Sequence, residues 1–151
     1  MKKRVLVISL GGSVIIPEKE HEQFLLRFRK LLKKNYRKYK FVLVCGGGSI
    51  ARAYQSVLKE EHKTIKEISR AGIRATRMNA AFVMQIFGKE ANDELPYTIK
   101  KVASELRKNK VAICGSLRFA PNETSDSTAA KVADYLNASF VNLTNVAGLY
   151  T

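Results

Sequence analysis

Val42-Leu43-Val44-Cys45-Gly46-Gly47-Gly48-Ser49-Ile50-Ala51-Arg52 is the stretch around which the rest of the chain is organised. Its apolar start, rich in β-branched residues, predicts a strand, and Ser49 is a favourable N-cap for the helix-compatible run that follows. The three glycines between them allow a sharp turn and leave main-chain amides open to a ligand. The positive end of the helix dipole, with Arg52 in the first turn, would attract an anion. Taken alone, the stretch fits a phosphate-binding corner and a plain strand-to-helix turn equally well.

The composition suits one globular domain, because the chain has 151 residues and 46% of them are hydrophobic. No apolar run approaches the roughly 20 residues that a membrane span needs. The N-terminus also lacks the apolar core and cleavage motif of a signal peptide, so we expect a cytoplasmic protein. Cys45 and Cys114 each end an apolar run without a zinc-binding spacing. We expect both to be small buried thiols, and we expect no metal held by the protein.

The chain is strongly basic, with 27 Lys and Arg residues against 13 Asp and Glu residues and a formal net charge of +14. Such an imbalance attracts anions, which include nucleic acids, anionic membranes and phosphorylated small molecules. Much of the charge lies in residues 27–40, where a solvated helix face is the default interpretation. Arg70, Arg74 and Arg77 form a second basic stripe, which we interpret first as solvated surface and second as a ligand contact. No aromatic-rich nucleic-acid motif is present, so a nucleic-acid partner is disfavoured.

Apolar runs alternate along the chain with segments of helical periodicity. The predicted strands cover residues 4–10, 41–45, 111–114 and 139–143, with a brief continuation of the first strand over 14–16. The predicted helices cover residues 17–35, 50–58, 65–87, 99–108 and 127–136. This alternation predicts an α/β fold, a three-layer sandwich with a mainly parallel central sheet.

Glycine and polar residues gather at the carboxyl ends of the predicted strands, where parallel sheets bind their ligands. They are Gly11-Gly12-Ser13, Gly46-Gly47-Gly48, Gly115 with the loop to Ser125, and Thr144-Asn145. Two glycine corners at one edge suit a pair of ligands that together carry several phosphates, as in phosphoryl transfer. Neither the Walker A spacing nor G-x-G-x-x-G occurs, and no nucleophile–base pair is apparent. Phosphoryl transfer needs mainly positioning and charge stabilisation, with Mg²⁺ arriving on the nucleotide.

Five stretches follow one another in an order that is familiar from one family. They are Ile8-Ser9-Leu10-Gly11-Gly12-Ser13-Val14-Ile15, Val44-Cys45-Gly46-Gly47-Gly48-Ser49-Ile50-Ala51-Arg52-Ala53-Tyr54, Gly72-Ile73-Arg74-Ala75-Thr76-Arg77-Met78-Asn79-Ala80, Thr124-Ser125-Asp126-Ser127-Thr128-Ala129-Ala130 and Thr144-Asn145-Val146-Ala147-Gly148-Leu149-Tyr150-Thr151. Together they resemble the amino-acid kinase superfamily and, within it, the archaeal-type UMP (uridylate) kinases. The resemblance extends over essentially the whole chain.

The resemblance implies transfer of the γ-phosphoryl group of ATP to UMP, giving UDP for pyrimidine nucleotide biosynthesis, with Mg²⁺ carried by the ATP. It implies catalytic roles at the transferring phosphate for Gly12, Ser13 and Arg52. The implied UMP contacts are Gly47, Ser69, Leu117, Thr124 and Ser125. The implied ATP contacts are Gly12, Ser13, Gly48, Arg52, Thr144, Asn145 and Tyr150. Members of the family usually form homohexamers, so the resemblance also implies a homo-oligomer.

Three motif positions differ from the common pattern of the family. Ser9 stands where many members have lysine, Ser69 where a UMP-binding aspartate is usual, and Ala147 where an aspartate is common. Family members also continue past Tyr150-Thr151 into a second lobe that covers the ATP base. We therefore expect residues 1–151 to form the N-terminal, phosphoryl-acceptor half of a kinase, without the C-terminal nucleotide lobe and completed, if at all, by another chain.

Two alternative functions remain open from the sequence. The first is a non-catalytic kinase remnant that acts as a basic module binding RNA or a protein, which the net charge of +14 and the three differing motif positions would suit. The second is another small-molecule kinase of the same superfamily, which only a comparison of acceptors would separate from a UMP kinase.

Overall fold

The computed structural model describes residues 2–15, 24–118 and 124–143, and its strands form one four-stranded sheet. The strands are β1 (Arg4–Leu10), β2 (Tyr39–Cys45), β3 (Val111–Cys114) and β4 (Ser139–Leu143). They lie in the order β3-β2-β1-β4, and every neighbouring pair is parallel. The prediction of a parallel α/β sheet is confirmed, and all four carboxyl ends lie at the same edge of the sheet.

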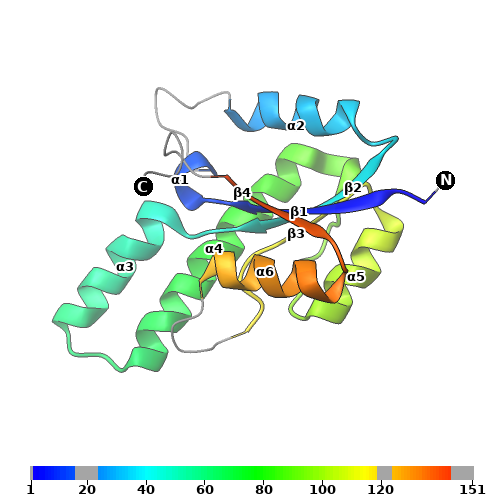
Figure 1. Ribbon diagram of the computed structural model, residues 1–151. Helices are drawn as coiled ribbons and strands as arrows, with labels where there is room; N and C mark the ends of the chain where they lie inside the picture. The colour runs from blue at the N-terminus through cyan, green and yellow to red at the C-terminus, as the bar shows by residue number, and fades with distance from the viewer. Residues whose placement is uncertain (1, 16–23, 119–123, 144–151) are drawn as a thin grey trace, which may run out of the picture.

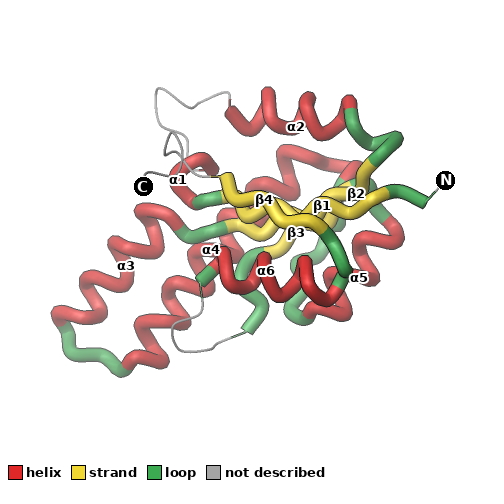
Figure 2. The backbone as a smooth tube through the Cα atoms, viewed as in Figure 1, coloured by secondary structure: helices red, strands yellow, loops and turns green. Residues whose placement is uncertain are grey.

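Helices cover both faces of the sheet, as the ribbon and tube views show (Figures 1 and 2). One face is covered by α2 (Phe24–Lys34) and α4 (Ile65–Phe87), and the other by α5 (Ile99–Lys108) and α6 (Ser125–Tyr135). The predicted three-layer arrangement is therefore confirmed. Helix α3 (Gly48–Glu60) lies mainly along the first half of α4, beyond the carboxyl edge of the sheet.

The central strands are apolar on both faces, because each face is covered by helices. In β2, Phe41, Leu43 and Cys45 join the core shared with α2 and α4. The alternate residues Val42 and Val44 join the core shared with α5 and α6. Strand β4 differs, since most of its side chains are exposed at the edge of the sheet.

The structure differs from the predicted elements mainly near the first glycine corner. Residues 12–15 form the short helix α1 (Gly12–Ile15), so the predicted continuation of the strand over 14–16 is wrong for its described part. The amide of Val14 donates a hydrogen bond to the carbonyl of Gly11 at 3.1 Å, which turns the chain away from the sheet. The remaining bounds shift by a few residues at most, and the start of the predicted helix 17–35 lies outside the described residues. None of the described helices is long and apolar enough to span a membrane.

Candidate phosphate-binding site

The loop after β1 and the loop after β2 pack directly against each other. A Cβ atom on Gly12 would overlap the backbone of Gly47 and Gly48, and one on Gly48 would lie 2.8 Å from the carbonyl carbon of Gly12. Gly48 also has a φ of +60°, a conformation that residues with a side chain rarely adopt. The geometry therefore requires glycine at both positions, and the two predicted corners form one continuous backbone surface.

The N-terminus of α3, which begins at this surface, has no side-chain cap. Gly47 is its N-cap residue, and the predicted N-cap, Ser49, lies within the first turn instead. In contrast, Thr64, Thr98 and Thr124 cap α4, α5 and α6 through their side chains. Because the first amides of a helix need an acceptor from outside the helix, the start of α3 is suited to an anion.

The side chain of Asn79, in α4, holds the triple-glycine loop in place through hydrogen bonds. Its side-chain amide donates hydrogen bonds to the carbonyls of Gly46 at 2.8 Å and Gly47 at 3.3 Å. Asn79 is 5% exposed, so water cannot easily replace these bonds. Asn79 belongs to the Gly72–Ala80 motif, and the sequence predicts no separate role for it. Its position, 33 residues after Gly46, gives no local signal of this contact.

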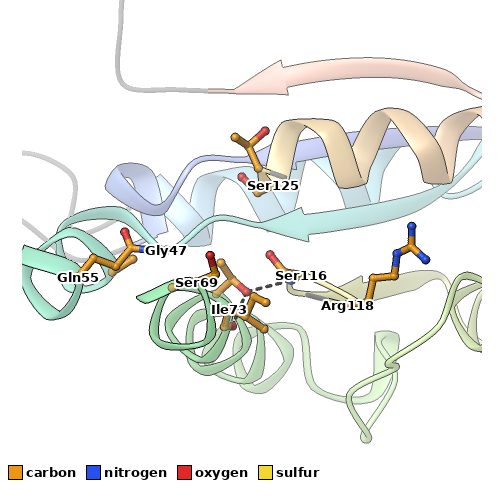
Figure 3. Close-up of a pocket in the computed structure, with 11 residues that line it drawn as sticks. Gly47, Gln55, Ser69, Ile73, Ser116, Arg118 and Ser125 are labelled. Carbon is orange, nitrogen blue, oxygen red and sulfur yellow. Dashed lines mark hydrogen bonds between the residues drawn. The ribbon is translucent and has the colours of Figure 1, made fainter. Parts of the chain in front are cut away.

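A cavity of about 170 Å³ opens beside the corner, between α3, α4, the loop after β3 and the start of α6 (Figure 3). Its lining residues are Gly47, Ala51, Gln55, Ser69, Gly72, Ile73, Thr76, Ser116, Arg118, Thr124 and Ser125. Figure 3 shows Gly47 and Gln55 at one end of this cavity and Arg118 at the other. Ser125, from the start of α6, and Ser69, from α4, lie on opposite sides. We call this space the corner cavity.

The corner cavity brings together four of the five residues predicted to contact UMP. They are Gly47, Ser69, Thr124 and Ser125. The fifth, Leu117, is buried and lines a neighbouring cavity instead. The next residue, Arg118, supplies the only guanidinium group among the described residues that line the corner cavity.

The residues predicted to contact ATP lie outside the corner cavity where the structure describes them. Gly12 and Gly48 form the contact between the two loops, and Ser13 is half-buried in α1. Arg52, predicted to act at the transferring phosphate, is exposed in the first turn of α3. The other predicted ATP contacts lie outside the described residues; they are Thr144, Asn145 and Tyr150.

Two side chains of α4 anchor the loop that follows β3. The hydroxyl of Thr76 accepts a hydrogen bond from the amide of Ser116 at 2.9 Å. Arg77 donates from Nε to the carbonyl of Ser116 at 3.0 Å and from Nη2 to that of Leu117 at 2.9 Å, and its guanidinium lies 4.6 Å from the centre of the Tyr97 ring. The interpretation of the arginine stripe as solvated surface is therefore wrong for Arg77. It is right for the other two arginines of the stripe, which are exposed.

The carboxylate of Asp126, for which the sequence predicts no role, bridges β1 and β4 near the carboxyl edge of the sheet. The hydroxyl of Ser9, which is fully buried, donates a hydrogen bond of 2.5 Å to Oδ1 of Asp126. The side-chain amide of Asn142 donates a hydrogen bond to Oδ2 of the same carboxylate at 3.3 Å. Ser9 is thus a positioning residue for Asp126 in the first turn of α6. In the sequence, the only indication of a role for Asp126 is its place in the Thr124–Ala130 motif.

Both cysteines are free and buried, as predicted. Burial raises the pKa of Cys114 to about 12, and burial, with a smaller contribution from the nearby Cys114, holds the pKa of Cys45 well above its usual range. Among the described residues, no group of three or more His, Cys, Asp or Glu side chains is arranged to hold a metal ion.

The two thiols should react very slowly in the folded protein. At pH 8, a pKa of about 12 for Cys114 leaves roughly one thiol in ten thousand ionised, and the buried sulfur is also inaccessible. We expect 5,5′-dithiobis(2-nitrobenzoate) to label both cysteines at least about 100-fold more slowly in buffer than in 6 M urea. Equal rates in the two solvents would show that the thiols are not buried.

The sheet, the paired glycine loops and the open start of α3 define an α/β domain whose carboxyl edge is suited to binding an anion such as phosphate. Residues 4–151 match the model of the amino acid kinase family. The chain belongs to the amino acid kinase family, and the family predicted from the five ordered motifs is confirmed.

Uridylate kinases are among the similar proteins. The one from Methanococcoides burtonii is 33% identical over 148 residues, which cover 97% of this chain and 62% of that protein. The crystal structure of the uridylate kinase from Archaeoglobus fulgidus has a TM-score of 0.84 at 31% identity, covering 97% of this chain and 65% of that one. A UMP kinase structure from Ureaplasma parvum, at 21% identity and a TM-score of 0.78, shares the fold. The chain therefore spans less than two thirds of the length of the uridylate kinases from M. burtonii and A. fulgidus.

Proposed function

We propose that this chain forms the acceptor half of a UMP kinase, which transfers the γ-phosphoryl group of ATP to UMP. The observation that carries the proposal is the corner cavity, which joins Gly47 and the uncapped start of α3 to Ser69, Arg118 and the start of α6. The similarity to uridylate kinases supports the choice of UMP over other acceptors. In this proposal, the phosphate of UMP binds at the start of α3, and its nucleoside extends toward Arg118.

The residues on the other side of the corner fit the phosphates of ATP. Because Gly12 and Gly48 pack backbone to backbone, main-chain groups reach this surface without obstruction by side chains. ATP would supply the phosphoryl group, and Mg²⁺ on the nucleotide would spread its charge. Arg52, exposed in the first turn of α3, is free to extend toward the phosphates, and Asp126 is held at the same edge of the sheet. A homo-oligomeric assembly stays a prediction from the family.

Titration calorimetry of the full chain with UMP tests the acceptor site. We expect saturable binding that Arg118→Ala weakens about tenfold, because a charge-assisted hydrogen bond at a partly enclosed site is worth about 1.4 kcal/mol. Arg52→Ala should also weaken binding, whereas Arg74→Ala, on an exposed side chain outside the cavity, serves as the matched control and should not. No heat and no thermal shift at millimolar UMP would overturn the proposal.

Two further measurements separate the alternatives. A coupled assay with ATP and UMP measures turnover by this chain directly, and AMP, CMP, acetylglutamate and isopentenyl phosphate are tested beside UMP as acceptors. Preference for one of these would assign the chain to another branch of the family. Salt-sensitive binding of RNA without binding of UMP would instead favour a basic binding module.

A further inference from the structure

A second, larger cavity lies on the α5 and α6 side of the sheet, next to the corner cavity. Its volume is about 550 Å³, which is within the range of pockets that bind small organic molecules. It lies between the start of α5, the loop after β3 and one face of α6. Its lining includes Tyr97, Lys100, Leu117, Arg118 and Tyr135. We call it the tyrosine cavity.

The lining of the tyrosine cavity combines aromatic rings with positive charge. Tyr97 precedes α5 and Tyr135 ends α6, and these side chains are 55% and 54% exposed although both line the cavity. Leu117, 8% exposed, supplies an apolar surface between them. Lys100 and Arg118 are exposed cations, and no carboxylate is among the described residues that line the cavity. Aromatic faces favour planar rings, and the cations favour a negative charge.

Part of the cavity wall is fixed before any ligand binds. The guanidinium of Arg77 lies 4.6 Å from the centre of the Tyr97 ring, and the same group donates a hydrogen bond to the carbonyl of Leu117 at 2.9 Å. Arg77 therefore positions both Tyr97 and Leu117 in the wall of the cavity. A preformed wall lowers the entropy that binding a ligand would cost.

We propose that the tyrosine cavity is a binding site for a planar aromatic anion, the chemistry shared by nucleotides and aromatic carboxylates. The ring system lies against Tyr97 and Tyr135, and the anionic group pairs with Lys100 and Arg118. This site is separate from the corner cavity, although Arg118 lines both. The proposal does not depend on UMP kinase activity, since it concerns a different cavity.

The fluorescent aromatic anion 8-anilinonaphthalene-1-sulfonate is a suitable probe for the full chain. We expect one saturable site, weakened at least tenfold by Tyr97→Ala and by Tyr135→Ala. Tyr54→Ala removes an equally exposed tyrosine of α3, 55% exposed and outside the cavity, and should leave the affinity unchanged. Circular dichroism is used to check that each variant is folded, and Tyr135, 54% exposed at the end of α6, is not part of the buried core.

Two controls test the charge and the location of the bound probe. Lys100→Glu should weaken the sulfonate probe and leave the neutral N-phenyl-1-naphthylamine unchanged. Arg52→Ala, which should weaken UMP binding and whose side chain does not line the tyrosine cavity, should leave the sulfonate probe bound. The proposal is wrong if binding does not saturate, if the three tyrosine variants bind alike, if the neutral probe binds as tightly as the anion, or if Arg52→Ala weakens the probe as much as the tyrosine variants at the cavity do. Displacement of the sulfonate probe by nucleoside triphosphates would indicate that the site accepts nucleotides. Displacement by indole-3-carboxylate would indicate that it accepts aromatic carboxylates.

Discussion

Gly48→Ala is expected to lower the free energy of unfolding by about 3 kcal/mol and to remove UMP binding. Two effects add together at this position. The φ of +60° is unfavourable for alanine, and the new methyl group would lie 2.8 to 3.1 Å from the backbone of Gly12. Backbone cannot rotate away as a flexible side chain can, so the two loops must separate. Their separation would displace the start of α3, where we propose that phosphate binds.

Gly88→Ala is the matched control for this variant. Gly88 also has a φ of +60°, but no atom lies within 4 Å of the position that its Cβ would occupy. Its φ of 60° and ψ of −127° form a combination that only glycine readily adopts, so we expect this control to lose about 2 kcal/mol of stability from backbone strain alone and to keep full UMP binding. Urea denaturation of both variants measures the difference, and calorimetry measures the binding. Full UMP binding by Gly48→Ala, or loss of UMP binding by Gly88→Ala, would contradict the close packing of the two glycine loops.

Asn79→Ala should be the second most damaging change among those considered, with a loss of about 2 to 3 kcal/mol in the free energy of unfolding. The substitution leaves the carbonyls of Gly46 and Gly47 without their hydrogen-bond donor. Because Asn79 is only 5% exposed, water cannot easily take its place. A freed loop would also lose its fixed shape, so we expect UMP binding to weaken at least tenfold. Urea denaturation and calorimetry again give the two quantities.

Asn35→Ala provides a chemically matched comparison, because the Asn35 amide also donates to a backbone carbonyl, that of Leu31 at 2.9 Å, but at an exposed bond. It should cost about 0.5 kcal/mol. Asn79→Asp keeps the shape of the side chain and should be as damaging as alanine at neutral pH, since a carboxylate cannot donate. Its folded-state pKa would be raised, so stability should recover as the pH falls and a protonated carboxyl can donate. Full stability of the aspartate variant at pH 8 would refute the role given to the amide.

The sheet and the location of the corner were predictable because their signals are local. A continuous apolar run bounded by polar residues predicts β3 at 111–114, and the alternation of strands with helices requires parallel pairing. Parallel pairing brings all carboxyl ends to one edge, so the two glycine corners could be expected to meet there. The threonine caps of α4 and α6 follow from the same kind of local pattern.

The parts that could not be predicted depend on contacts between residues far apart in the chain. Val14 and Ile15 are typical strand residues, yet they lie in a helical turn in the loop that packs against Gly48. The bond between Ser9 and Asp126 joins residues 117 positions apart, and no spacing rule indicates it. Arg77 likewise anchors the loop after β3 through carbonyls about 40 residues away in the chain. A helical wheel shows only the neighbours of Arg77 within α4, so it cannot indicate this contact.

The backbone contact between Gly12 and Gly48 also constrains how this chain can change over evolutionary time. Because a side chain at either position would occupy the space of the other loop, a mutation at one glycine is not rescued by a smaller residue at its partner, since none exists. A side chain at either position therefore requires the two loops to separate, and a change in the length of one loop is the way to achieve this. Among descendants of this gene that keep the corner, we expect glycine at both positions; where one glycine is lost, we expect an insertion or deletion in the other loop.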